Sequence, residues 1–152
     1  MASWESIVSA APDLAAHVRR CFAVRKHCTV ATLRRDGSPR ISGTEIEFGD
    51  DGDVYLGMLP ASVKALDLRR DPRLALHGPT VDPPEDDPRA WLGDAKLAGR
   101  AVEVAGPPSE RAAHRFRIDV TEVVLTTVAP SGVHLRIRSW HPGRGVEETQ
   151  RR

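Results

Sequence analysis

The apolar positions of this chain first follow a helical period and then the shorter period of strands. Leu14, Val18 and Phe22 recur at four-residue spacing, which predicts a helix over 12–22 with one apolar stripe. Proline at position 12 and aspartate at 13 suit the first turn of that helix. From residue 27 onward the apolar runs are short and β-rich, so a sheet is expected to follow.

A hairpin and a third strand come next. Two β-rich runs lie within His27–Phe48 and flank Asp36-Gly37, a dipeptide typical of tight hairpin turns. An acidic, glycine-containing turn over 50–53 then leads to a third strand over 54–58.

The segment that follows this strand predicts an anion site. Between Val54 and Arg73 the sequence reads VYLGMLPASVKALDLRRDPR, in which Ser62 and Lys64 open a helix that stops at Asp71-Pro72. A hydroxyl at a helix N-cap, a nearby lysine and free backbone N–H groups suit a phosphate. The alternative is an ordinary N-cap serine followed by a solvated lysine.

The second half of the chain continues mainly in strands. A short helix is predicted over 109–116, after two prolines, and the proline-rich acidic run over 81–89 predicts an exposed loop. Further β-rich runs predict strands over 73–77, 95–104, 118–128 and 133–140.

This order of elements indicates a mainly β fold with flanking helices. Six or seven strands in mainly antiparallel order favour a closed or split barrel over a doubly wound parallel sheet. The sequence has no glycine-rich dinucleotide fingerprint and no P-loop, and a phosphate is therefore expected to belong to a bound cofactor. We expect one domain over 1–152, frayed at 1–10 and 144–152.

Composition and charge narrow the choice of partners. The chain has 152 residues, 40% of them hydrophobic, and a net charge of +1, which is typical of a soluble domain. The near-neutral charge and 5% aromatic content argue against nucleic acid. We expect no membrane partner and a cytoplasmic location, because no apolar run reaches membrane-spanning length and no signal peptide is evident.

Cysteines and histidines give no pattern of reactive or metal-binding groups. Cys21 and Cys28 are interpreted as small core residues, because two cysteines are too few for a disulfide framework. The six histidines show no metal-ligand spacing, so no metal site is expected.

Two segments resemble the FMN-binding split-barrel family related to pyridoxamine 5′-phosphate oxidase. They read ATLRRDGSPRISGTEI and DVYLGMLPASVKALDLRRDPRLALHG, and the resemblance covers roughly residues 20–140. The most specific part is Ser-x-Lys-x-x-x-Leu followed by Arg-Arg-Asp-Pro-Arg. The resemblance implies a six-stranded split barrel that forms a homodimer, with flavin lying across the subunit interface. Some branches of the family carry the deazaflavin F420, and others bind haem or bilins.

The resemblance also implies which residues contact the cofactor. Residues on the second strand would lie along the ring, the end of the third strand would supply backbone near it, and the helix start would hold the phosphate. Arg40 would add a second positive charge. The residues implied are Ser42, Gly43, Thr44, Gly57, Met58, Ser62, Val63, Lys64 and Arg40.

Structural alternatives exist for several of these residues. Gly43 can mark a bulge or a close contact in a strand, and Met58 can fill the core. Arg69 and Arg70 are interpreted as a solvated helix end, and Trp140 as a barrel or interface residue. At Val63 many relatives carry an arginine that grips phosphate, and that charge is missing here.

The function implied is hydride transfer by a bound cofactor. We expect an oxidoreductase that uses F420 or FMN and acts on an unknown small molecule, since no residue stands out as an acid or base. The substrate-binding Arg and His motif of true pyridoxamine-phosphate oxidases is not evident, so oxidation of vitamin B6 is not expected. The alternatives are a non-catalytic flavin, haem or bilin carrier or sensor, and a structural dimer without cofactor.

Overall fold

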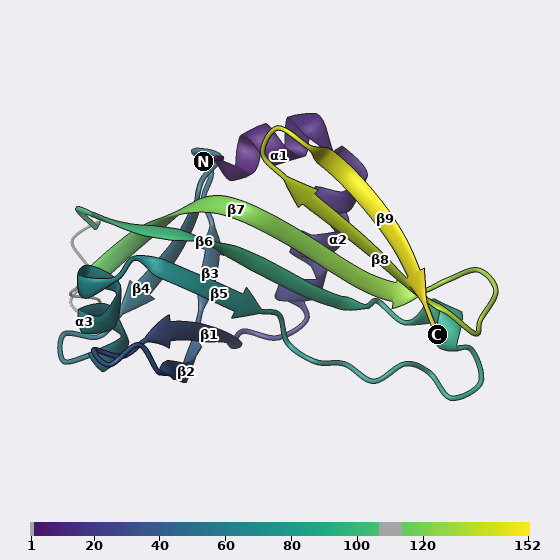
Figure 1. Cartoon of the computed structure of the whole chain (residues 1–152), viewed down its shortest axis with the longest axis horizontal. Helices are drawn as coiled ribbons and strands as arrows, with labels where there is room; N and C mark the ends of the chain where they lie inside the picture. The colour runs from purple at the N-terminus through teal and green to yellow at the C-terminus, as the bar shows by residue number, and fades with distance from the viewer. Residues whose placement is uncertain (1, 107–113) are drawn as a thin grey trace.

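The computed structural model describes residues 2–106 and 114–152, which form a strongly curved antiparallel sheet with helices at its margins (Figure 1). The helices are α1 (Trp4–Ala10), α2 (Pro12–Ala23), α3 (Val63–Arg70) and the 3₁₀ turn η1 (Pro88–Ala90). The strands are β1 (Cys28–Leu33), β2 (Pro39–Thr44), β3 (Ile46–Phe48), β4 (Val54–Met58), β5 (Arg73–His77), β6 (Asp94–Val104), β7 (His114–Val128), β8 (Leu135–His141) and β9 (Gly145–Arg151).

The first half of the chain agrees with the sequence prediction. The helix predicted over 12–22 is α2, the hairpin around Asp36-Gly37 joins β1 to β2, and the third strand is β4. Gly37 adopts a φ of 84°, a left-handed conformation that glycine takes without steric penalty in a tight turn. The helix predicted to begin at Ser62 is α3.

The order of strands explains why the sheet curls. Its path is β2-β1-β5-β6-β7-β4-β3, with the β8–β9 hairpin attached to β7. The two strands at the ends of this path are consecutive in sequence, because only Glu45 separates β2 from β3. The edges of the sheet therefore meet at Glu45, where the barrel is split.

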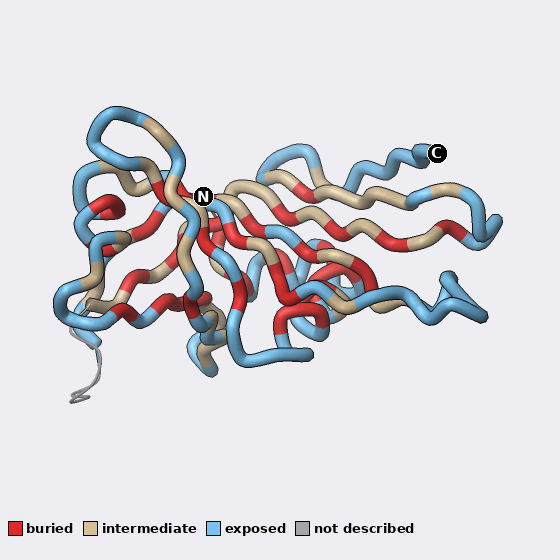
Figure 2. Tube along the Cα trace, turned by 90° about the horizontal axis from the view of Figure 1, so that it is seen from below, coloured by how far each residue is buried: buried red, intermediate tan, exposed pale blue. Residues whose placement is uncertain are grey.

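The two N-terminal helices cover the core. The stripe of Leu14, Val18 and Phe22 is buried, as predicted. The Trp4 ring also packs there, edge-on to Phe48 with 5.0 Å between ring centroids. Buried positions run along the strands and along the faces of the helices that meet them (Figure 2).

The described residues at both ends of the chain form secondary structure, which contradicts the prediction that these ends are frayed. Ala2 forms an antiparallel bridge with Val120, and α1 is capped by the Ser3 side chain, which accepts from the backbone N–H of Ser6. At the other end β9 pairs with β8 along its whole length. Polar sequence misled the prediction here, because an exposed edge strand needs backbone pairing more than apolar side chains.

The second half departs from prediction mainly in β7. The helix predicted over 109–116 falls largely outside the described residues, and its last three residues belong to this strand. Within the described part of the chain, β7 pairs with β4, β6 and β8. The loop predicted over 81–89 is exposed and irregular up to the short turn η1. No helix among the described residues is long and apolar enough to cross a bilayer.

Candidate functional site

Two adjoining pockets surround the split in the barrel and the start of α3, and every predicted site residue lines one of them. We call the first, of about 480 Å³, the helix pocket; it is lined by Arg34, Arg40, Ile41, Ser42, Leu59, Ala61, Ser62, Val63 and Lys64. We call the second, of about 510 Å³, the split pocket; it is lined by Lys26, His27, Gly43, Thr44, Glu45, Ile46, Glu47, Gly57, Met58, Leu59 and Lys64.

Lys64 lies on the boundary between the two pockets. Its Nζ donates a hydrogen bond to the backbone carbonyl of Gly43 at 3.2 Å, which links the first turn of α3 to β2. An ammonium group has three donors, so a single backbone contact leaves capacity for an anion in either pocket.

The start of α3 is arranged as the sequence predicts, with one informative difference. Ser62 occupies the N-cap position with extended backbone angles, but its hydroxyl makes no capping hydrogen bond among the described residues. Ser62 and the first two residues of the helix line the helix pocket, and the structure shows no acceptor for the Ser62 hydroxyl among the residues it describes. Free donors of this kind at a helix N-terminus favour an anion.

Arg40 owes its position to a carboxylate that sequence reasoning missed. Asp67 is 2% exposed and accepts from Arg40 Nε at 2.7 Å, Thr32 Oγ1 at 2.8 Å and Arg70 at 2.9 Å. Because Asp67 engages only the Nε of Arg40, the terminal nitrogens of that guanidinium remain for the helix pocket. An aspartate one turn after Lys64 on α3 was the sequence signal for this contact.

Opposing influences set the pKa of Asp67. Burial is the largest and acts to raise the pKa, but the hydrogen bonds from Arg40, Thr32 and Arg70 together lower it below its usual value. The carboxylate is therefore ionised at neutral pH and holds both arginines in place.

Alternation along β2 sends its side chains to opposite faces of the sheet. Ser42 and Thr44 share the inner face with Arg40, and Thr44 is 5% exposed. The Thr44 hydroxyl is buried with no hydrogen-bond partner anywhere in residues 2–106 and 114–152. An unpaired buried hydroxyl is unfavourable, and the residue that carries it lines the split pocket.

Gly43 leaves open space above the sheet. No described atom lies within 4 Å of a Cβ built at this position, and the pairing of β1 with β2 continues through it without a bulge. The predicted alternative of a bulge or close internal contact is therefore wrong. The missing side chain instead opens the split pocket toward β2.

The end of β4 supplies the opposite wall of the split pocket. Gly57 is exposed, whereas the Met58 side chain is 2% exposed and packs in the core. Cys28 lies directly across from Thr44 in the β1–β2 register, and burial raises the pKa of its thiol to about 11. Such a thiol is protonated and unreactive, which agrees with the interpretation of Cys28 as a core residue.

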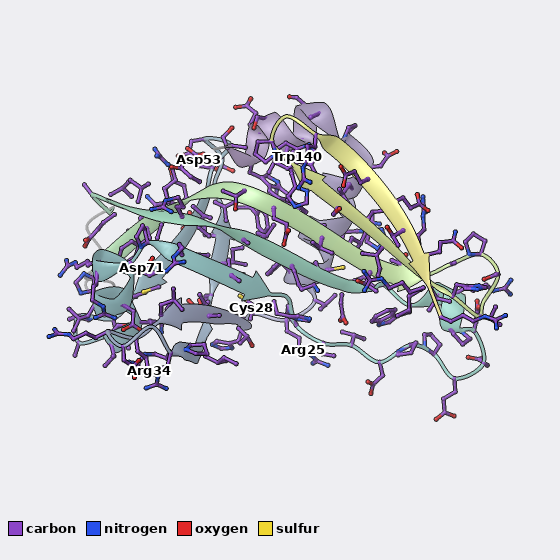
Figure 3. All side chains as sticks on the ribbon, in the orientation of Figure 1. Arg25, Cys28, Arg34, Asp53, Asp71 and Trp140 are labelled. Atoms are coloured by element: carbon purple, nitrogen blue, oxygen red, sulfur yellow. The ribbon has the colours of Figure 1, made fainter. Side chains whose placement is uncertain are left out.

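Other candidate residues have structural roles. Arg69 and Arg70 are exposed in the last turn of α3, as predicted, and they also pair with Glu103 and Asp67 respectively. Trp140 is 5% exposed within the core, as expected of a barrel residue. Figure 3 shows it on the β8–β9 hairpin, away from Arg34 beside the helix pocket. No cluster of three or more potential metal ligands occurs among the residues described.

Large apolar side chains are exposed around the helix pocket. Ile41 is 75% exposed, Leu59 66%, Leu66 55% and Val63 52%. Val63 stands where many members of the resembled family carry arginine, so it contributes apolar surface here rather than charge. Clustered exposed apolar side chains mark a binding surface in a soluble protein.

Three solved structures resemble this chain along most of its length. PhzG from Burkholderia lata 383, in complex with tetrahydrophenazine-1-carboxylic acid, has a TM-score of 0.63 at 14% identity over 97% of this chain and 92% of its own. A pyridoxamine 5′-phosphate oxidase-related, FMN-binding protein from Nostoc punctiforme PCC 73102 has a TM-score of 0.61 at 10% identity, over 100% and 98%. A haem-binding protein from Mycobacterium smegmatis has a TM-score of 0.54 at 16% identity, over 91% and 87%.

These likenesses define a fold. The chain has the split-barrel fold of pyridoxamine 5′-phosphate oxidase-related proteins, as its sequence predicts. The sequence matches no protein-family model and no curated protein. Proteins of this fold bind different cofactors, including FMN and haem in the two relatives above, so the ligand must be argued from the pockets themselves.

Proposed function

We propose that this protein is an oxidoreductase that binds FMN or F420 and transfers hydride to or from a small molecule. The observation that carries the proposal is a group of polar side chains that retain hydrogen-bonding capacity where two pockets adjoin. Arg40, Ser62 and Lys64 line the helix pocket, the Ser62 hydroxyl makes no capping hydrogen bond among the described residues, and Lys64 also lines the split pocket.

The residues present suit a ligand with a phosphate at one end and a flat ring at the other. In this proposal Ser62, Lys64 and Arg40 hold the phosphate in the helix pocket. The open space at Gly43, on the face of β2 opposite to Thr44, admits the ring edge. A bound flavin or deazaflavin would itself supply the hydride chemistry, so this chain needs to anchor and orient it.

The same proposal includes a homodimer. Ile41, Leu59, Val63 and Leu66 expose apolar surface beside the helix pocket, and a second copy packed there would cover this surface. Covering it would also exclude water from the ligand, which strengthens each charged contact to a phosphate. We expect sedimentation to give twice the mass of one chain, and Leu66→Glu to yield monomer.

Fluorescence titration of the purified protein with FMN and with F420 is the test. Saturable binding of either at micromolar concentration, followed by reduction and reoxidation of the bound cofactor by an added acceptor, supports the oxidoreductase. Binding without turnover, or preference for haem or a bilin over both cofactors, would point to a carrier or sensor. If no cofactor binds, the proposal is wrong.

A further inference from the structure

A histidine outside the two pockets holds the loop that shapes one of them. His114 opens β7, and its Nε2 lies 3.1 Å from the backbone carbonyl oxygen of Pro60. Pro60 belongs to the loop over 59–62 that joins β4 to α3, and three residues of this loop line the helix pocket. The imidazole is largely enclosed, since its side chain is 12% exposed.

An ion pair on the other side of the ring orients the histidine. His114 Nδ1 lies 3.1 Å from a terminal nitrogen of Arg69 and 3.3 Å from Glu103 Oε1. Arg69 in turn makes two hydrogen bonds to the Glu103 carboxylate, at 2.7 and 2.8 Å. The hydrogen bond from Arg69 is the largest influence on Glu103 and lowers the pKa of that carboxyl to about 2.

Both protonation states of the ring keep the contact with Pro60. In the neutral ring Nδ1 accepts from Arg69, which leaves the proton on Nε2 to be donated to the Pro60 carbonyl. In the charged ring Nδ1–H donates to Glu103, and Nε2–H still donates to Pro60. The Arg69–Glu103 pair therefore fixes the ring with its Nε2 donor directed at the loop.

The backbone pairing shows why the loop needs this contact. β4 pairs with β7 up to Met58 opposite His114, and the chain then leaves the sheet. From there to the start of α3, one backbone hydrogen bond within the loop is found among the described residues, from Ser62 N–H to the Leu59 carbonyl. Among the hydrogen bonds of the described residues, the one from the His114 side chain ties this turn back to the sheet.

We propose that His114 is a positioning residue for the helix pocket. By holding the Pro60 carbonyl it fixes the loop over 59–62, and with it the Ser62 hydroxyl and the first N–H groups of α3. The ligand class is the phosphate-bearing cofactor of the proposed function, on which this inference rests. A loop held in advance loses less conformational freedom when the ligand binds.

Three substitutions of His114 distinguish the hydrogen bond made by Nε2 from the contacts made by Nδ1. His114→Gln retains a donor close to the position of Nε2, His114→Asn retains one close to Nδ1, and His114→Ala retains neither. His134→Ala is the matched control, because His134 contacts Ser131 in the β7–β8 turn far along the chain. The first readout is hydrogen exchange of the Ser62 amide, which donates to the Leu59 carbonyl, in ligand-free protein, and the second is the FMN and F420 titration.

We expect exchange of the Ser62 amide in this loop to be about fivefold faster in His114→Ala and His114→Asn, the effect of one net hydrogen bond. Cofactor affinity should fall by a similar factor in both variants, and His114→Gln should restore both quantities. His134→Ala should change neither. If His114→Ala does not fold, the contrast between the Gln and Asn variants gives the same answer.

The two proposals can fail separately. Unchanged loop exchange in His114→Ala, or equal restoration by Asn and Gln, would overturn the role of His114 whatever the wild type binds. Faster exchange with unchanged cofactor affinity would also overturn it. A wild type that binds neither cofactor, with loop exchange behaving as expected, would remove the proposed function and leave the loop contact standing.

Discussion

The centre of the sheet and the end that carries α3 use their side chains differently. Along β6 and β7 alternate residues are buried against the helices and the backbone pairs over eleven positions of β6. Around α3, by contrast, apolar side chains face solvent, and in the described part of the chain Ser62 makes no capping bond and the buried Thr44 hydroxyl has no partner. The first region buries its apolar side chains within one chain, although Asp94 Oδ1 at the start of β6 has no partner among the described residues. The second region leaves apolar side chains exposed, as binding surfaces do.

Two glycines show this difference most sharply. In β6, Gly99 lies at the register shift, and a Cβ there would be 2.2 Å from the backbone oxygen of Asp119. In β2, Gly43 has no described atom within 4 Å of the same position. Gly99 is therefore required by the packing of the sheet, whereas Gly43 lies beside open space.

The largest expected effect is on stability, from Gly99→Ala. The added methyl group meets backbone rather than a movable side chain, so the bulge must open, and we expect a loss of about 3 kcal/mol. Chemical denaturation followed by circular dichroism measures this change. A loss under about 0.5 kcal/mol, the range of ordinary surface substitutions, would contradict the view that the centre is closely packed.

A smaller loss is expected for Asp67→Asn. The variant removes the charge that Arg40 and Arg70 share, and because both arginines are partly exposed we expect about 2 kcal/mol. Asp86→Asn is the matched control, because it makes the same chemical change at an exposed residue for which no ion pair is found in the described part of the chain, and it should leave stability unchanged.

The pH dependence of this effect has a definite sign. The pKa of Asp67 is lower in the folded protein than its ordinary value of 3.8, so folding is favoured by the ionised form. The stabilisation is fully present above that value and is lost as the pH falls through the folded-state pKa. The difference between wild type and Asp67→Asn should be constant near neutrality and shrink below about pH 4. A difference that grows in acid would contradict the assignment.

The sequence predicts the fold better than the site because the two depend on different information. The stripe of Leu14, Val18 and Phe22 and the turn at Asp36-Gly37 depend on spacing alone, and the structure agrees with both. β9 was missed because an exposed edge strand has no apolar pattern to detect.

Contacts at the site join residues that are distant in the sequence. Asp67 reaches Thr32 and Arg40 across 35 and 27 residues, and His114 reaches Pro60 across 54. No local pattern encodes such contacts, since they arise from the curl that brings β1, β2 and β7 around α3. The resemblance of the Ser62–Lys64 segment to a known family pointed to a region where the structure has a pocket, whereas the residues that support this region could be found only from the structure.

At the α3 end, Lys64→Ala should weaken cofactor binding and leave stability nearly unchanged. Loss of a charge-assisted hydrogen bond to phosphate is worth roughly 1–3 kcal/mol, or roughly tenfold in Kd. Lys96→Ala on the exposed face of β6 is the matched control and should bind as the wild type does. Equal affinity in Lys64→Ala and wild type would remove the assignment of Lys64 as the phosphate anchor.

The smallest effect in energy is the most discriminating, because Gly43→Ala should move stability and binding in opposite directions. A Cβ at this position meets no described atom, and alanine restricts the unfolded chain more than glycine does, so stability should rise by about 0.5 kcal/mol. The same methyl group projects into the space left for a ring in the split pocket, and cofactor affinity should fall by about fivefold. Denaturation and the FMN and F420 titrations on one preparation measure both quantities.

If binding is unchanged while stability rises, the space at Gly43 is not part of the ligand site. If stability falls as it does in Gly99→Ala, the two glycines do not differ. The contrast between a closely packed β6–β7 region and an open region around α3 would then be wrong.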